Sequence, residues 1–258
     1  MYLIKNLIKK IFFYLFQKYK IIFNKPGLEF VDTSQLVTFN ESYKNFRNYK
    51  EGLKRSNNEH TENFLKQNRF LNVIHTAKYI LSQNEVFDFA ECGCWRGHSS
   101  FLIAKSIFES GKKINFHIFD SFEGLSKSTA NDGNFHEIIN QEKIKIEKQF
   151  ASSEEFLNKK VLNDFNFCKT YNGWIPSRFH EIDSKKFSFV HIDVDLYEPT
   201  IKSLEFFYPR LVPGGIIIFD DYNFNVWQGG KKAWDEYFKG KKNLFFYENP
   251  TGGCFLIK

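Results

Sequence analysis

The sequence predicts an α/β protein with a doubly wound, mostly parallel seven-stranded sheet, and three patterns indicate this fold. From residue 61 onward, short apolar runs of strand length alternate with longer segments of helical periodicity, as expected of successive strand–helix units. Two of the runs end in carboxylates, Asp193 after one and the pair Asp220–Asp221 after the next. The chain closes with two apolar runs separated by Asn249-Pro-Thr-Gly-Gly253, which is typical of a terminal antiparallel hairpin.

The individual elements follow from the same runs. Strands are expected at residues 86–92, 114–119, 167–171, 187–192, 216–219, 244–247 and 254–257. Helices are expected at residues 61–81, 99–109, 197–210 and 231–238, together with a charged helical stretch that ends near residue 163. In the first helix Phe64, Leu71 and Ile74 recur at helical spacing.

The composition indicates a folded protein without a nucleic-acid partner. Of the 258 residues, 42% are hydrophobic and 19% aromatic, which is too apolar for a disordered chain. The net charge of +6 lies in residues 1–25, which contain six lysines and no acidic residue, so the remainder carries 30 basic and 30 acidic residues. Cys92, Cys94, Cys168 and Cys254 lack paired CxxC spacing. We therefore expect reduced cysteines in a cytoplasmic protein and no zinc site.

Three segments are expected along the chain. Residues 1–25 read as a basic amphipathic helix, whose longest apolar run, Ile11–Phe16, is far shorter than the ~20 residues of a membrane span. Such a helix can lie on an anionic surface at the inner face of the membrane, or dock on the domain or on a second copy of the chain. Residues 26–60 are expected to form a loop or cap on the acceptor side. Residues 61–258 are the main domain.

The strand-terminal carboxylates predict a metal site. The carboxyl ends of parallel strands meet at one edge of the sheet, so Asp193, Asp220 and Asp221 should converge there. Three adjacent carboxylates repel one another unless they share a proton or a cation, and oxygen ligands favour Mg²⁺ or Ca²⁺ over zinc. The alternative is that the Asp220–Asp221 pair bonds a turn. Asp195 reads as an N-cap or loop carboxylate beside the helix that follows it, and the alternative is that it is a further metal ligand.

A glycine turn after the first strand of the main domain predicts a nucleotide site. Glu91-Cys-Gly93-Cys-Trp95-Arg-Gly97 opens a helix, and its glycines allow backbone to approach a ligand closely. Asp120 ends the next strand, where a carboxylate can accept hydrogen bonds from ribose hydroxyls. An acidic turn of this kind suits a sulfonium nucleoside better than a pyrophosphate. The alternative for Glu91 is that it caps the helix after the turn.

These motifs carry a family resemblance. The chain contains, in order, Glu91-x-Gly-x-Trp-Arg-Gly97, Asp120-Ser-Phe-Glu-Gly-Leu125, Gly173-Trp174, Asp193-x-Asp195-Leu-Tyr-Glu-x-Thr200, Tyr208-Pro-Arg-Leu-x-Pro-Gly-Gly215 and Asp220-Asp-Tyr222. Over residues 69–238 this set resembles the macrocin and mycinamicin O-methyltransferases, the TylF/MycF family. The resemblance implies a Rossmann-like class I fold that uses S-adenosylmethionine and Mg²⁺, or Mn²⁺ in its place, to methylate a sugar hydroxyl.

The resemblance also assigns roles to residues. It implies that Asp193, Asp220 and Asp221 hold the metal and that Asp193 is the base. It places Glu91, Gly93, Trp95, Gly97, Asp120, Ser121 and Trp174 at the cofactor. His136 and Tyr222 are expected to contact the acceptor, a sugar in a glycan or a glycosylated natural product. A homo-oligomer is compatible with these expectations.

Two other classes of function stay open at this stage. One is a non-catalytic nucleotide-binding or scaffolding domain of the same fold, which loss of a metal carboxylate would have favoured. The other is a dinucleotide-dependent dehydrogenase. The absence of GxGxxG spacing in the glycine turn and the presence of Trp95 within it argue against a dehydrogenase.

Overall fold

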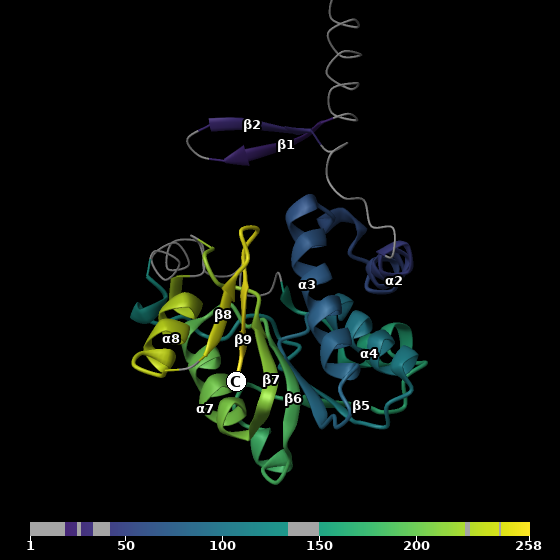
Figure 1. The fold of residues 1–258 in the computed structure, drawn as a ribbon, viewed down its shortest axis with the longest axis vertical. Helices are drawn as coiled ribbons and strands as arrows, with labels where there is room; N and C mark the ends of the chain where they lie inside the picture. The colour runs from purple at the N-terminus through teal and green to yellow at the C-terminus, as the bar shows by residue number, and fades with distance from the viewer. Residues whose placement is uncertain (1–18, 25–26, 33–41, 134–149, 225–227, 243) are drawn as a thin grey trace, which may run out of the picture. The chain divides into compact units, whose positions relative to one another are not determined.

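The computed structural model describes residues 19–24, 27–32, 42–133, 150–224, 228–242 and 244–258 (Figure 1). By its internal contacts the chain divides into two compact units, residues 1–47 and residues 48–258. None of the helices in the described ranges is long and apolar enough to cross a membrane.

The described part of the first unit contains a hairpin where sequence periodicity predicted a helix. Strand β1 (Tyr19–Asn24) pairs antiparallel with β2 (Gly27–Asp32), with Ile21 opposite Phe30 and Phe23 opposite Leu28. The helix predicted over residues 1–25 is therefore wrong for residues 19–24, and residues 1–18 lie outside the described ranges. Aromatic and β-branched side chains favour a strand once a turn supplies a partner.

The predicted loop over residues 26–60 was also wrong in part, because it contains β2 and helix α2 (Ser42–Arg55). Tyr49 and Leu53 are one helical turn apart and are buried. The many charged residues around this pair obscure its helical spacing. A short 3₁₀ helix, η1 (Glu59–Thr61), separates α2 from the next helix.

The second unit is built on one seven-stranded sheet with the order β5-β4-β3-β6-β7-β9-β8. Its strands are β3 (Asp88–Cys92), β4 (Phe116–Asp120), β5 (Cys168–Asn172), β6 (Phe187–Ile192), β7 (Leu211–Phe219), β8 (Phe245–Glu248) and β9 (Cys254–Ile257). Strands β3 to β7 pair in parallel, whereas β9 pairs antiparallel with both β7 and β8. The predicted fold class, including its terminal hairpin, is confirmed.

Helices cover both faces of this sheet (Figure 1). Helices α3 (Phe64–Leu81) and α4 (His98–Ser110) pack together on one face, and α7 (Tyr197–Arg210) and α8 (Gln228–Phe238) pack together on the other. The predicted charged stretch before residue 163 is described only from residue 150, where α6 (Glu154–Phe156) continues into a π-helical turn, η4 (Leu157–Val161). Two 3₁₀ turns, η2 (Ala130–Asp132) and η5 (Phe179–Ile182), complete the described elements.

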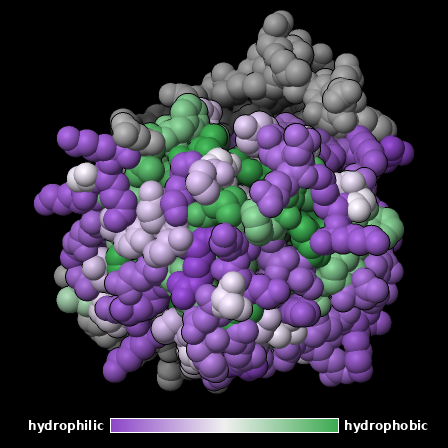
Figure 2. Space-filling model, turned by 60° about the horizontal axis from the view of Figure 1, so that its bottom comes forward, coloured by the Kyte–Doolittle hydropathy of each residue, from purple (hydrophilic) through white to green (hydrophobic). Residues whose placement is uncertain are grey.

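The core explains which strand boundaries were predictable. All six residues of β6 are buried, and this central strand has the predicted bounds. Strand β7 instead begins five residues before the predicted start at Ile216, because Phe187 pairs with Leu211 whereas Phe189 pairs with Ile216. The bulge between them accommodates the Pro213-Gly-Gly215 run, which reads as a strand breaker. Polar side chains cover most of the face in Figure 2, and apolar ones show in patches between them.

Candidate active site

The site lies at the carboxyl edge of the central strands. Backbone hydrogen bonds carry the register one residue past each strand: Asp193 N–H donates to Cys92 O at 2.8 Å and Asp220 N–H donates to Ile192 O at 3.0 Å. Gly93 N–H donates in the same way to Phe119 O at 2.8 Å. The residues that follow β3, β6 and β7 are thus held side by side, as the predicted parallel order requires.

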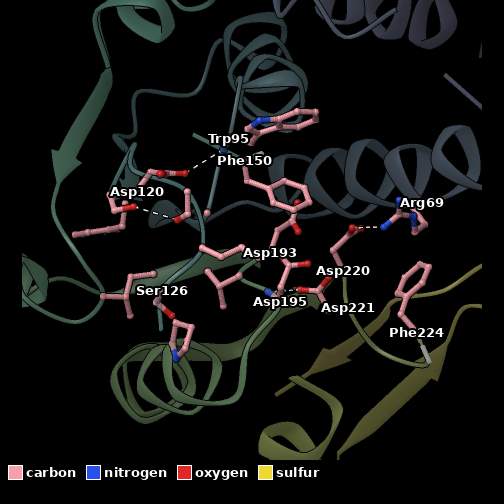
Figure 3. Close-up of a pocket in the computed structure, with 18 of the residues that line it drawn as sticks. Arg69, Trp95, Asp120, Ser126, Phe150, Asp193, Asp195, Asp220, Asp221 and Phe224 are labelled. Carbon is pink, nitrogen blue, oxygen red and sulfur yellow. Dashed lines mark hydrogen bonds and ion pairs between the residues drawn. The ribbon is translucent and has the colours of Figure 1, made fainter. Parts of the chain in front are cut away.

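A cavity of about 340 Å³ opens at this edge (Figure 3). Its volume lies at the lower end of the range of small-molecule sites. Of the predicted site residues, it is lined by Gly93, Trp95, Asp120, Ser121, Trp174, Asp193, Asp220 and Asp221. Helix α3 and the turn before it add Thr61, Asn63, Lys66, Arg69 and Phe70.

The three predicted metal carboxylates lie together. One oxygen from each of Asp193, Asp220 and Asp221 lies within 4.8 Å of the other two. Burial, and then the charges of Asp220 and Asp221, raise the pKa of Asp193 well above its usual range. Burial, and then the charge of Asp195, raise the pKa of Asp221 in the same way. These shifts show that the ionised cluster is short of positive charge.

One arginine supplies part of that charge, and sequence analysis did not single it out. Arg69 of α3 forms an ion pair with Asp220, and its guanidinium lies 4.9 Å from the centre of the Phe224 ring (Figure 3). Its Nε is buried and has no hydrogen-bond partner among the described residues. No short motif marks Arg69, because its role depends on how α3 docks against the end of β7.

The donor set fits a divalent cation. The three carboxylates are hard oxygen ligands within reach of one ion, as Mg²⁺ and Mn²⁺ prefer. Arg69 offsets one negative charge, and the pKa of Asp193 is raised despite it. A cation with two charges would relieve the repulsion that remains.

Asp195 contributes its backbone to this cluster. Its N–H donates to Asp221 Oδ2 at 2.8 Å, and its φ of 59° places it in the left-handed region. The N-terminus of α7 is capped by Asp132, whose Oδ1 accepts from Tyr197 N–H at 2.7 Å. The predicted capping role of Asp195 thus belongs to a residue 65 positions before Tyr197.

The glycine turn is shaped by close backbone contact. Gly93 has a φ of 81°, and a Cβ there would lie 2.8 Å from the carbonyl carbon of Asp193 and closer still to its oxygen. Gly97, with a φ of 83°, precedes α4, where a Cβ would overlap Leu157. Gly97 is outside the cavity lining and serves packing. Gly93 lets the ends of β3 and β6 meet.

Asp120 organises the same turn. Its Oδ2 accepts from Cys94 N–H at 2.7 Å and from Trp95 N–H at 3.0 Å, and its Oδ1 accepts from Phe122 N–H at 2.7 Å. The carboxylate also lines the cavity. A carboxylate has about four lone-pair sites, so one acceptor position remains for a ligand hydroxyl. Trp95 packs edge-on against Phe150, with 5.7 Å between ring centres.

The structure places Glu91, a predicted cofactor contact, away from the cavity. Glu91 is fully buried within β3, where it accepts from Ser100 Oγ and lies 2.9 Å from His191 Nδ1. It does not line the cavity, which argues against the predicted contact with the cofactor. Its hydrogen bond with Ser100, in the first turn of α4, instead supports the alternative, in which Glu91 stabilises the start of that helix.

Of the two predicted acceptor residues, Tyr222 alone belongs to the described part of the chain. The Tyr222 hydroxyl donates to Asp235 at 3.0 Å and accepts from Lys231 Nζ at 3.1 Å. Tyr222 lies outside the cavity lining, so its predicted contact with the acceptor is not supported. His136 lies outside the described residues. All four cysteines are free, as expected of reduced thiols.

Comparison with known proteins gives a consistent result. A family model described as "Macrocin-O-methyltransferase (TylF)" matches residues 27–245. The chain is 29% identical over 161 residues to the Streptomyces olivaceus 8-demethyl-8-(2,3-dimethoxy-alpha-L-rhamnosyl)-tetracenomycin-C 4'-O-methyltransferase, covering 60% of each chain. It is 26% identical over 162 residues to the Micromonospora griseorubida mycinamicin III 3''-O-methyltransferase, covering 60% of this chain and 62% of that one. The matched part therefore spans about 60% of the length of these relatives.

Solved structures show the same fold. The O-methyltransferase NovP superposes with a TM-score of 0.61 at 23% identity, over 74% of this chain and 79% of that one. A calicheamicin methyltransferase superposes with a TM-score of 0.59 at 16% identity, over 84% of this chain and 93% of that one. At these identities the likeness carries the fold alone.

Proposed function

Because this chain belongs to the macrocin O-methyltransferase (TylF) family, we propose that it transfers a methyl group from S-adenosylmethionine to a hydroxyl group of an acceptor. The observation that carries the proposal is one cavity that joins the glycine turn, Asp120 and three clustered carboxylates. Family membership alone would not identify the residues of the site, and the cavity alone would not identify the reaction. Together they favour methyl transfer over a non-catalytic binding domain.

Each part of the cavity has a role in this proposal. Gly93 and Trp95 form the floor beside the sulfonium nucleoside, and Asp120 accepts from a ribose hydroxyl. Ser121 and the half-exposed ring of Trp174 lie at the adenine end. The negative cluster around Asp193 attracts a cationic donor, whose charge is lost as the methyl group moves. Positioning of the two reactants therefore dominates the rate enhancement.

Asp193, Asp220 and Asp221 would hold a Mg²⁺ ion, which Mn²⁺ can replace. When bound, the ion would lower the pKa of a coordinated hydroxyl. Transfer breaks the bond between sulfur and the methyl carbon and forms one between that carbon and the acceptor oxygen. The hydroxyl proton passes to the carboxylate of Asp193, the proposed base.

The acceptor is proposed to be a sugar hydroxyl in a glycan or a glycosylated natural product. Two relatives support this class by name, since one acts at a 4'-oxygen of a rhamnosylated tetracenomycin and the other at a 3''-oxygen of mycinamicin III. The uneven charge of the chain, with its excess confined to residues 1–25, gives no basis for a nucleic-acid acceptor.

Removal of metal tests the reaction. Methyl transfer to a panel of glycosides, followed by mass spectrometry, should require Mg²⁺ or Mn²⁺ and should stop in EDTA. Asp220→Asn should weaken Mg²⁺ binding by at least about 10-fold. Loss of a residue that only hydrogen-bonds a metal ligand already costs about that much affinity, and loss of a ligand itself should cost no less. The same variant should bind S-adenosylhomocysteine with an affinity within a factor of about two of the wild type, since the residues proposed to contact the cofactor are unchanged.

Asp195→Asn is the matched control, because it removes a carboxylate charge from the same cavity without removing a proposed ligand. If Asp195→Asn weakens Mg²⁺ binding as much as Asp220→Asn does, the cluster acts only through its net charge. Full activity after exhaustive chelation would remove the metal from the mechanism.

Residues 1–25 are proposed to be an anchor outside the catalytic unit. Six lysines without an acidic residue would bind an anionic membrane surface, at about 1 kcal/mol for each lysine near it. Flotation of the full chain with anionic liposomes should then fall as salt is added. If flotation is absent and deletion of residues 1–25 lowers the oligomer mass, the segment is a contact between copies of the chain. If the deletion unfolds the protein, the segment is part of the core.

A further inference from the structure

The cavity is strongly unbalanced in charge. Among the described residues that line it, five are aspartates and only two are cationic. The aspartates are Asp120, Asp193, Asp195, Asp220 and Asp221. The cations, Lys66 and Arg69, both come from α3. Arg69 is paired with Asp220, so Lys66 is the cavity cation whose role is unexplained.

Lys66 is buried and has no ionic partner among the residues that the structure describes. The residue is 7% exposed, and its Nζ donates to Thr61 Oγ1 at 2.6 Å. The ammonium lies 5.2 Å from the centre of the Phe70 ring. In the described part of the chain it forms no salt bridge. An ammonium has three N–H donors, so donors remain for a ligand in the cavity that Thr61, Lys66 and Phe70 line.

The position of Lys66 is electrostatically unfavourable without such a ligand. Asn63 caps α3 by accepting from Lys66 N–H at 2.9 Å, so the lysine lies in the first helical turn, which has no acidic residue. A cation there opposes the positive end of the helix dipole. Burial, and then the charge of Arg69, lower the pKa of Lys66 to about 8. An anionic group beside Lys66 would relieve both effects.

We propose that Lys66 binds the methionine carboxylate of S-adenosylmethionine, an inference that rests on the proposed function. This donor carries two positive groups, a sulfonium and an ammonium, which the aspartates of the cavity attract. Its one negative group is the carboxylate, which the same aspartates repel. Among the described residues that line the cavity, Lys66 is the cation that no carboxylate pairs with, whereas the charge of Arg69 is offset by Asp220. An anionic acceptor is a poorer occupant, because it would bring no compensating positive charge into a cavity with five aspartates.

The test compares S-adenosylmethionine with its decarboxylated form, which keeps the sulfonium and the ammonium and lacks only the carboxylate. In calorimetry the wild-type protein should bind the complete donor about 10- to 100-fold more tightly, the range of one charge-assisted hydrogen bond. Lys66→Met should lose most of that preference by weakening the binding of S-adenosylmethionine alone. Lys66→Arg should keep it. Lys78→Met, on the same helix and outside the cavity lining, should match the wild type.

Three results would overturn either this proposal or the proposed function on which it rests. Equal affinity of the wild-type protein for the two donors would refute the inference without any variant. If Lys66→Met loses the same factor of affinity for both donors while its melting temperature is unchanged, the lysine shapes the cavity and does not bind the carboxylate. If the wild-type protein binds neither donor, the proposed methyl transfer itself fails, and that outcome is distinct from the first two.

Discussion

Gly93 offers the sharpest test of how the fold builds the site, through Gly93→Ala. The substitution has two costs. An L-residue at a φ of 81° carries about 1–2 kcal/mol of backbone strain. The added methyl group would also overlap the carbonyl of Asp193, which belongs to the backbone and cannot rotate away. Forcing a methyl group into close-packed structure costs about 1–3 kcal/mol more. The free energy of unfolding should therefore fall by about 2–5 kcal/mol.

Gly111→Ala separates the two costs. Gly111 follows α4 with a φ of 69°, and no atom of the described residues lies within 4 Å of a Cβ built there. This variant should lose only the backbone term, about 1–2 kcal/mol. Urea unfolding measures both losses under one set of conditions. Because relief of the overlap moves Asp193, Gly93→Ala should also lose methyl transfer at temperatures where it is fully folded, and Gly111→Ala should not. Equal losses of stability and activity in the two variants would refute this account of the strand junction.

Two further predictions concern Asp120 and His98. Asp120→Ala should raise the dissociation constant of S-adenosylmethionine by about 10- to 100-fold, since a ribose contact is lost together with the acceptor of three backbone N–H groups; unchanged calorimetric affinity would show that Asp120 does not contact the cofactor. Burial, and then the charge of Lys66, lower the pKa of His98 to about 3, so the unfolded chain takes up a proton on acidification before the folded protein does. Relative to His98→Gln, the wild-type protein should lose about 2 kcal/mol of unfolding free energy between pH 7.5 and 5, and parallel pH profiles would contradict the buried neutral ring.

Much of the fold could be predicted because its central strands are buried on both faces. Such strands read as continuous apolar runs, and β6 and α7 have the predicted bounds. The sequence pattern gave the wrong element or the wrong bounds where pairing with another strand decides the structure. Strand β1 depends on its pairing with β2, and the early start of β7 depends on a bulge against β6. The local pattern of apolar residues gives no information about either partner strand.

The cations of the site were missed for a related reason. A carboxylate that follows a strand is placed by the sheet itself, so Asp193 and Asp220 could be brought together from sequence. Lys66 and Arg69 are placed by the docking of α3 on the sheet, which helical spacing alone does not fix. Lysine and arginine in a predicted helix also usually face solvent.

The same reasoning explains why Glu91 differs from the other acidic residues near these strand ends. Asp193 and Asp220 come directly after the last residues of β6 and β7, and Asp120 is the last residue of β4. All three reach the cavity. Glu91 precedes the last residue of β3, within the paired part of the strand and opposite His191. A carboxylate there must bury its charge and takes partners from the core, as Glu91 does with Ser100 and His191. A difference of one or two positions at a strand end thus separates a structural carboxylate from one that can meet a ligand.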